Sequence, residues 1–209
     1  MVTNNKKFEC DFLVIGSGIS GLSFALKVAT EFKESKVVIV TKDEKSESNT
    51  KYAQGGISTV YDKTVDSFEQ HIEDTLIAGD GICDPKAVKM VIEDAPDRLQ
   101  ELIDWGTKFD KNKNGYYDLG REGGHSQNRI LHHADITGAE IERALIAQVN
   151  AQPNIDFLTH HYAIDVITEH QVKKKQIKRN SKISCYGAYV LDEKNSVVKT
   201  FSTHIISAG

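Results

Sequence analysis

A glycine-rich stretch close to the start of the chain constrains the fold more than any other feature. An apolar run at residues 12–15 leads directly into the pattern G-x-G-x-x-G, formed by Gly16, Ser17, Gly18, Ile19, Ser20 and Gly21. Apolar residues then recur at helical spacing over residues 22–29. A strand, a glycine turn and a helix in this order predict a dinucleotide site, because the helix N-terminus presents N–H groups to the diphosphate. The alternative is a glycine-rich turn without a ligand.

The three glycines of this pattern have separate predicted roles. Gly16 allows the tight turn, Gly18 lets a diphosphate approach the backbone, and Gly21 lets the helix pack closely against the strand. A β-branched run at residues 36–40 follows, so residues 10–42 are predicted to form the strand–helix–strand unit of a parallel sheet. The predicted fold class is therefore α/β, of the Rossmann-like type.

The residues after the second strand bear on which dinucleotide binds. NAD sites place Asp or Glu there to accept hydrogen bonds from the ribose, whereas this chain has Thr41 and Lys42, followed by Asp43 and Glu44. Lysine cannot accept a hydrogen bond, so plain NAD binding is disfavoured. A 2′-phosphate, or an FAD whose adenosine is held differently, stays open.

Composition excludes several classes of protein. With 39% hydrophobic and 27% charged residues, the chain is an ordinary globular protein and not a disordered one. No run approaches the roughly 18 apolar residues of a spanning helix, and the first ten residues are too polar for a secretion signal, so we expect a cytoplasmic protein without a membrane partner. The net charge of -4 disfavours nucleic acid. Three widely spaced cysteines predict neither a disulfide framework nor a metal knuckle.

Residues 46–59 form a loop of small and polar side chains in which Gly55 and Gly56 are adjacent. Paired glycines indicate that the backbone passes very close to another group, and a flat or anionic ligand is one such group. An ordinary turn is the alternative. Because the loop follows the glycine pattern, we interpret it as a cofactor loop.

The region 66–106 is predicted to be helical and to serve only core packing. The first helix has an apolar face of Phe68, Ile72 and Leu76. Asp84 is the expected N-cap of a second helix. We expect Pro96 to break or kink that helix.

The loop at residues 119–138 is chemically the densest part of the chain. It places Arg121, Glu122, His125 and Ser126 beside paired glycines, a set able to bind a small charged substrate. One alternative is a structural ion-pair loop, and another is a metal site. A metal is disfavoured because no helical His-x-x-x-His pair exists, and in the calcium-like segment that begins at Asp110 the twelfth ligand position is arginine.

Residues 138–209 are predicted to form a helix and a small β-meander. Thr137 and Glu140 match a capping box for the helix. Strands are expected at residues 155–158, 162–168, 184–191 and 197–201, with a further strand that begins at residue 203 and ends in a glycine turn. The basic run 173–179 is interpreted as a solvated turn. Because a strand that reaches a small-residue turn normally continues, we expect these residues to be the N-terminal piece of a longer protein.

Taken together, these motifs resemble the N-terminal part of the L-aspartate oxidases, in the wider family of succinate dehydrogenase and fumarate reductase flavoprotein subunits. The most specific segments of the resemblance are residues 49–56, 74–84 and 121–135. The resemblance implies a Rossmann-like FAD-binding fold of the three-layer ββα type, with the β-meander, and with the capping and C-terminal helical domains of the family lying beyond residue 209. It also implies that the catalytic arginine and the substrate histidines lie there.

The resemblance implies FAD as the cofactor. Besides the glycine pattern, the implied FAD contacts are Lys42, Asn49, Thr50, Lys51, Tyr52, Ala53, Gln54, Gly55, Gly56, Tyr162 and Ala163. Relatives that bind the flavin covalently have histidine where this chain has Asn49, so a noncovalent FAD is expected.

The resemblance also implies a substrate role for Glu122. Fumarate and succinate have no amino group, whereas the ammonium of L-aspartate can pair with a carboxylate. The implied reaction is oxidation of L-aspartate to iminoaspartate, with dioxygen or fumarate reoxidising the flavin and quinolinate synthase using the product in NAD biosynthesis. By themselves, these 209 residues are expected to be inactive and to bind FAD weakly. The alternatives are a fumarate reductase or succinate dehydrogenase flavoprotein, and a noncatalytic dinucleotide-binding module.

Overall fold

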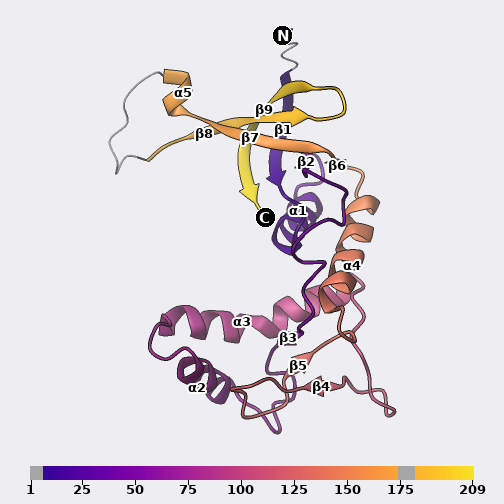
Figure 1. Ribbon diagram of the computed structural model, residues 1–209, viewed down its shortest axis with the longest axis vertical. Helices are drawn as coiled ribbons and strands as arrows, with labels where there is room; N and C mark the ends of the chain where they lie inside the picture. Colours follow the sequence, from indigo (N-terminus) through magenta and orange to yellow (C-terminus); the bar gives the residue numbers. More distant parts are fainter. Residues whose placement is uncertain (1–6, 174–181) are drawn as a thin grey trace. The chain divides into compact units, whose positions relative to one another are not determined.

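The fold comes from a computed structural model that describes residues 7–173 and 182–209 (Figure 1). Contacts divide the chain into two compact units. The first unit comprises residues 1–49 and 145–209, and the second unit comprises residues 50–144. The predicted cofactor loop 46–59 is therefore divided after Asn49. Most of the predicted basic turn 173–179 lies outside the described residues.

The first unit is built on one mixed sheet. Its parallel part contains β1 (Lys7–Ile15), β2 (Val37–Val40), β6 (Ile155–Leu158) and β9 (Val197–Ala208). Its antiparallel part adds β7 (His161–Thr168) and β8 (Cys185–Asp192). The strand order is β6-β2-β1-β9-β8-β7. Helix α1 (Ile19–Glu31) joins β1 to β2, and the short helix α5 (Glu169–Lys173) follows β7. This arrangement confirms the predicted α/β FAD-binding fold class.

Strand β9 belongs to both parts of this sheet. Its first half pairs antiparallel with β8, from Val197 opposite Asp192 to Ser202 opposite Gly187. From Thr200, opposite Lys7, the strand also pairs parallel with β1 as far as Ala208 opposite Ile15. The sequence predicted two strands here, at 197–201 and from 203, and that division was wrong, because one continuous strand of 12 residues satisfies both neighbours.

The core of the first unit follows the apolar runs of the sequence. All four residues of β2 are buried, as expected of a parallel strand covered on both faces. One buried cluster joins Leu13 of β1 and Val38 of β2 to Val190 and Phe201 of the meander. Helix α1 buries Leu22, Ala25 and Leu26. The glycine turn between β1 and α1 is thus fixed by packing on both sides.

The second unit contains two helices and a small sheet. Helices α2 (Phe68–Ala78) and α3 (Pro85–Asp104) contact each other. Strands β3 (Ile57–Ser58), β4 (Leu119–Gly120) and β5 (Ile130–Leu131) form an antiparallel sheet in the order β3-β5-β4. Asp84 caps α3 as predicted, accepting a hydrogen bond from Lys86 N at 2.8 Å. The helix continues through Pro96, so the expected break does not occur.

Helix α4 (Thr137–Ala151) begins in the second unit. The predicted capping box uses its side chains differently. Thr137 Oγ1 accepts a hydrogen bond from His133 N at 3.0 Å, and Glu140 Oε1 accepts one from Lys108 N at 2.9 Å. Both side chains therefore tie the start of α4 to preceding loops.

Helix α2 departs most clearly from its predicted role. Its buried residues are His71 and Asp74, whereas Phe68, Ile72 and Leu76 are only half-buried. The prediction that apolar residues form the buried face of this helix was wrong, whereas the prediction that the helix has no chemical role is not tested. A helix that buries an imidazole and a carboxylate must provide partners for them, and those partners define one of the two candidate sites below.

Candidate functional site

The carboxyl ends of the parallel strands meet at one edge of the first unit's sheet. Ile15 lies opposite both Val40 and Ala208, and Val40 lies opposite Leu158. The residues that follow these strands are linked by backbone hydrogen bonds, from Gly16 N to Val40 O and from Gly209 N to Ile15 O, each 2.9 Å long. Ligands of open α/β sheets bind at this edge.

The structure explains differently why glycine occupies each of the three positions in the turn. Gly16 has φ +106°, and a Cβ atom there would collide with Gly209 O. A Cβ atom on Gly21 would collide with Gly16 O. Gly18 has φ -72°, which any residue adopts, so the backbone conformation does not require a glycine there. Room for an approaching diphosphate, the role predicted for Gly18, is compatible with this conformation.

The N-terminus of α1 is suited to an anion. Gly18 is the N-cap, no side chain caps the helix, and the first turn contains no acidic residue. The partial positive charge of the helix N-terminus is therefore not offset locally. Ser17 is buried, and its hydroxyl lies 3.1 Å from Thr41 Oγ1, while Ile19 and Ser20 are exposed. Ser17 thus has its backbone, and not its hydroxyl, to offer a ligand.

The end of β2 lies beside the start of β7 in the same unit. Thr41 O accepts a hydrogen bond of 2.8 Å from His161 N. Lys42 and Tyr162, the next residue on each segment, are both exposed, and Ala163 is half-buried. Asn49, at the end of the first segment of this unit, is exposed. The structure therefore brings Lys42 and Tyr162 close to the glycine edge of the sheet.

A buried ion pair fixes the start of β7. Lys199 Nζ lies 2.7 Å from Asp192 Oδ2 and 2.9 Å from His161 Nε2. His161 Nδ1 lies 2.7 Å from Thr159 O, so Nδ1 donates there and Nε2 accepts from the ammonium. Burial alone would raise the pKa of the Asp192 carboxyl, but hydrogen bonds from Lys199 and Asn195 hold it well below its ordinary value. Sequence analysis missed this cluster, whose members are far apart in the chain.

The predicted cofactor loop of the second unit folds as a turn against α4 and β5. Ala53 N donates to Thr50 O, and Gly138 N donates to Ala53 O at 2.9 Å. A Cβ atom on Gly56 would collide with Leu131 O, whereas Gly55 faces open space. The close approach predicted for the glycine pair is therefore made by Gly56 to the protein's own β5. Tyr52, Ala53, Gln54 and Gly55 are exposed, and Lys51 Nζ lies 5.4 Å from the ring centroid of Tyr52.

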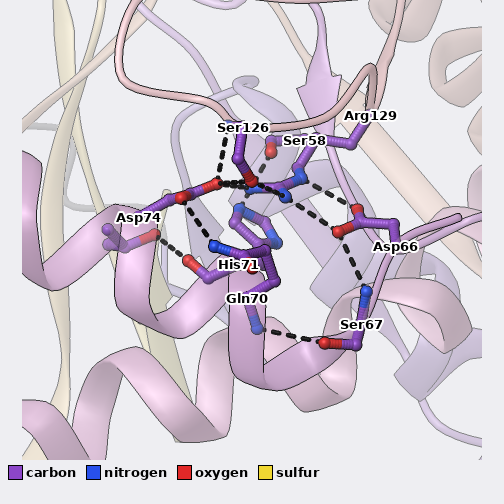
Figure 2. A network of polar contacts seen from close by, with 9 residues as sticks. Ser58, Asp66, Ser67, Gln70, His71, Asp74, Ser126 and Arg129 are labelled. Atoms are coloured by element: carbon purple, nitrogen blue, oxygen red, sulfur yellow. Dashed lines mark hydrogen bonds and ion pairs between the residues drawn. The ribbon is translucent and has the colours of Figure 1, made fainter.

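A buried arginine organises the other side of the second unit. Figure 2 shows the Arg129 guanidinium between two carboxylates. Its Nε and one terminal nitrogen donate to the two oxygens of Asp66 at 2.9 and 2.8 Å, and the other terminal nitrogen donates to Asp74 Oδ2 at 2.7 Å. The Arg129 side chain is fully buried. Two charge-assisted contacts to Asp66 in parallel fix both the position and the plane of the guanidinium.

The same cluster holds the loop that precedes β5. Asp74 Oδ2 accepts hydrogen bonds from both the backbone N and the hydroxyl of Ser126, each 2.8 Å long. His71 Nε2 lies 3.0 Å from Ser58 Oγ on β3 (Figure 2). Burial alone would raise the pKa of Asp74, but hydrogen bonds from Ser126 and Arg129 hold it well below its ordinary value. Burial lowers the pKa of His71, and the nearby charge of Arg129 acts in the same direction.

These contacts divide the predicted substrate loop into structural and free parts. Arg129 is buried in ion pairs, so for this residue the structural ion-pair interpretation is correct, and the exposed Ser126 is tied to the network through Asp74. Glu122 is exposed, and its carbonyl accepts a hydrogen bond from His125 N at 3.2 Å. Sequence analysis missed Asp66, His71 and Asp74. The available signal was a polar stripe on α2, where Gln70 Nε2 donates to Asp74 Oδ1 one turn away.

Among the described residues, no group of three or more His, Cys, Asp or Glu side chains could hold a metal ion. The calcium-like segment is a turn in which Asn112 Oδ1 accepts from Asn114 N and Tyr116 N. Within the described ranges, no helix combines the length and the apolar character needed to cross a bilayer.

Comparisons with known proteins agree on the type of domain. The sequence model of a family described as FAD binding domain matches residues 11–208. The chain is 45% identical over 195 residues to the chloroplastic L-aspartate oxidase of Oryza sativa, covering 93% of this chain and 28% of the rice protein. It is 43% identical to the L-aspartate oxidase of Vibrio cholerae, covering 97% of this chain and 37% of that protein. The chain thus spans about a third of the length of these relatives.

Solved structures with the same fold include a quinol fumarate reductase and an Sdh1 complex. A mutant of E. coli quinol fumarate reductase superposes with a TM-score of 0.86 at 22% identity, covering 98% of this chain and 33% of that one. The Mycobacterium smegmatis Sdh1 complex gives a TM-score of 0.83 at 24% identity, covering 98% and 34%. At these identities the likeness concerns the fold alone.

Proposed function

Because this chain belongs to the FAD binding domain family, with FAD as its cofactor, we propose that it forms part of an oxidoreductase that converts L-aspartate to iminoaspartate. The observation that carries the proposal is the 43–45% identity to proteins named L-aspartate oxidase, which extends over more than nine-tenths of the chain. Relatives of this similarity usually share their chemistry, and the loop with Glu122 adds a carboxylate for an amino-acid substrate.

The proposed FAD contacts are those that the resemblance implies, and each unit supplies some of them. In the first unit, the turn from Gly16 to Gly21 and the N-terminus of α1, which no side chain caps, hold the diphosphate, and Lys42, Asn49, Tyr162 and Ala163 contribute further contacts. In the second unit, the contacts come from the turn at residues 50–56, of which residues 52–55 are exposed. FAD is held noncovalently, since asparagine at position 49 offers no nucleophilic ring nitrogen. When bound, FAD supplies the two-electron acceptor for the substrate.

Glu122 binds and orients the substrate in this proposal. Its exposed carboxylate pairs with the ammonium of L-aspartate, which directs the hydrogen on the α-carbon toward the acceptor. The substrate loses this hydrogen as hydride and the nitrogen loses a proton, which leaves iminoaspartate. Dioxygen or fumarate is the proposed final acceptor. Use of the product by quinolinate synthase, and a cytoplasmic location, complete the proposal.

The test uses the complete gene product that contains these residues. Loaded with FAD and mixed anaerobically with L-aspartate, it should lose the visible absorption of the oxidised flavin, whereas succinate should have little effect. Glu122→Gln should raise the KM for aspartate about tenfold or more, while the KM for fumarate stays within about twofold. Asp118→Asn, which removes another exposed carboxylate near this loop, is the matched control. Flavin reduction by succinate but not aspartate would overturn the proposal.

A further inference from the structure

We propose that Asp74 and His71 of α2 are positioning residues that hold the Glu122 loop, here residues 120–126, in the geometry that binds the substrate ammonium. They touch neither the substrate nor the cofactor, and they act through Ser126 and His125. The inference rests on the proposed function for the role of Glu122. The anchoring itself depends only on contacts within the second unit.

The Glu122 loop is anchored at both of its ends. At the first end, Gly120 of β4 pairs with Ile130, and Gly120 O accepts a hydrogen bond of 3.0 Å from Arg129 N. At the second end, Ser126 donates twice to Asp74. His125, the preceding residue, packs its ring edge-on against the His71 ring, with centroids 5.8 Å apart and planes at 88°. Helix α2 therefore holds two consecutive loop residues.

Asp74 is itself held by a rigid frame. Its carboxylate also accepts from Arg129, whose guanidinium is clamped by Asp66 at the start of α2. His71 is tied to Ser58 of β3, and β3 pairs with β5. Asp66, His71 and Asp74 are each less than one-tenth exposed. Because Asp66, Asp74 and Arg129 are buried and mutually bonded, the Asp74 carboxylate has a fixed position, and displacement of Ser126 would remove two of the hydrogen bonds that this carboxylate accepts.

These buried contacts restrict a loop whose own sequence would leave it flexible. Glu122 is exposed and is followed by two glycines, so an unanchored loop would present its carboxylate in many orientations. Ordering such a loop at each binding event would weaken the affinity for substrate. Gly124 has φ +87°, so the chain turns at this residue, and the next residue, His125, packs against His71 of α2. Anchoring on both sides of a four-residue span leaves little freedom for Glu122 beyond its own side chain.

The first test measures the loop directly and needs no activity. In the complete gene product, amide hydrogen exchange of the peptide over residues 119–128 is compared between wild type, Ser126→Ala and Asp74→Asn. Ser126→Ala removes one contact to Asp74 and keeps the buried ion pairs, so the fold should persist. We expect exchange in this peptide to rise about three- to tenfold in Ser126→Ala and more in Asp74→Asn.

The matched control is Ser67→Ala, which removes the hydrogen bond that Ser67 Oγ accepts from Gln70 N at the start of α2. It weakens the same helix without touching the loop, so exchange should rise around residues 68–71 and stay unchanged at 119–128. Unchanged exchange of the loop in both Ser126→Ala and Asp74→Asn, or an equal rise in Ser67→Ala, would overturn the anchoring.

The second test separates positioning from general weakening of the fold. Ser126→Ala should raise the KM for L-aspartate about three- to tenfold with kcat within twofold, and should have no further effect in a Glu122→Gln background. An equal rise in both backgrounds would show that Ser126 does not act through Glu122, and would overturn the positioning role. If Glu122→Gln itself leaves the KM unchanged while the exchange result is as expected, the proposed role of Glu122 fails and the anchoring by α2 stands.

Discussion

The glycine turn of the first unit and the Glu122 loop of the second unit are both held in one backbone conformation, but by different kinds of interaction. The turn is specified by residues within six positions of one another, and its neighbours are apolar strands and a helix. The loop is held by Asp66 and Asp74, which lie 63 and 55 positions before their partner Arg129. A site made of backbone is thus encoded locally, whereas a site held by buried side chains depends on pairings that only the fold creates.

Removal of Arg129 should have the largest effect on stability of all the changes considered. Arg129→Met leaves Asp66 and Asp74 buried without their cation, so we expect the free energy of unfolding to fall by about 3–5 kcal/mol. Urea denaturation of the two proteins measures this difference. Arg98→Met is the matched control, because Arg98 makes ion pairs with Asp94 and Glu101 on the exposed surface of α3 and should contribute less than about 1 kcal/mol. Equal losses would contradict the structural importance of the buried network.

The next largest effect should come from a side chain within the glycine turn. Gly16→Ala places a Cβ atom at φ +106° and against Gly209 O, so we expect a loss of at least about 2 kcal/mol in the same measurement. Gly55→Ala, where the new Cβ atom would face open space, should change the free energy of unfolding by less than about 0.5 kcal/mol. A tolerated Gly16→Ala would show that the turn is not fixed by its backbone conformation.

Substitution of Gly18, the middle glycine, should separate an effect on FAD affinity from an effect on the stability of the fold. Gly18→Ala is compatible with φ -72°, and because alanine is a poorer N-cap than glycine, the free energy of unfolding should fall by about 1 kcal/mol or less. The added methyl group lies where the diphosphate is proposed to approach, so the affinity for FAD should fall about tenfold or more. Titration with FAD, followed by flavin fluorescence, measures the change. Unaltered affinity would remove Gly18 from the proposed cofactor contacts.

The smallest predicted effect is a pH dependence confined to the second unit. Because the pKa of His71 is lowered by burial and by Arg129, the unfolded chain binds more protons than the folded one. The contribution of His71 to the free energy of unfolding is fully present above the ordinary histidine pKa of 6.5. It is lost as the pH falls below that value, with a slope of less than about 1.4 kcal/mol per pH unit. His125 adds to the lowering, and the carboxylates of Asp66 and Asp74 oppose it.

His71→Gln should flatten this pH dependence, because glutamine does not titrate in this range. Urea denaturation of both proteins on either side of that pH gives the difference in slope. The same slope in wild type and variant would mean that His71 does not titrate between the folded and unfolded states in the way its burial indicates.

The parts of the protein that sequence analysis predicted well are those with local signals. The strand, turn and helix around Gly16, the cap at Asp84 and the FAD-binding family are confirmed. Failures occurred where a distant partner decides the outcome. Strand β9 is continuous because β1 and β8 both pair with it, and the Glu140 carboxylate accepts hydrogen bonds from Lys108 N and from Arg143 of its own helix. The burial of His71 and Asp74 in place of an apolar face depends on Arg129, which a helical pattern cannot reveal.

Within the candidate sites the same distinction holds. The glycine turn was predicted from sequence together with the separate reasons for Gly16 and Gly21. The Glu122 loop was identified as chemically dense, but which of its charges are buried and which are free became clear only from the partners of Arg129 and Ser126. The roles of individual residues toward FAD and aspartate stay predictions.

The visible spectrum of the purified complete gene product shows whether the turn from Gly16 to Gly21 holds the diphosphate of a flavin. We expect a yellow protein, or a colourless one that becomes yellow with added FAD, whose flavin is released into the supernatant on acid precipitation. The Gly18→Ala variant should bind the same flavin more weakly. A colourless wild-type protein that does not take up FAD would rule out the proposed diphosphate site.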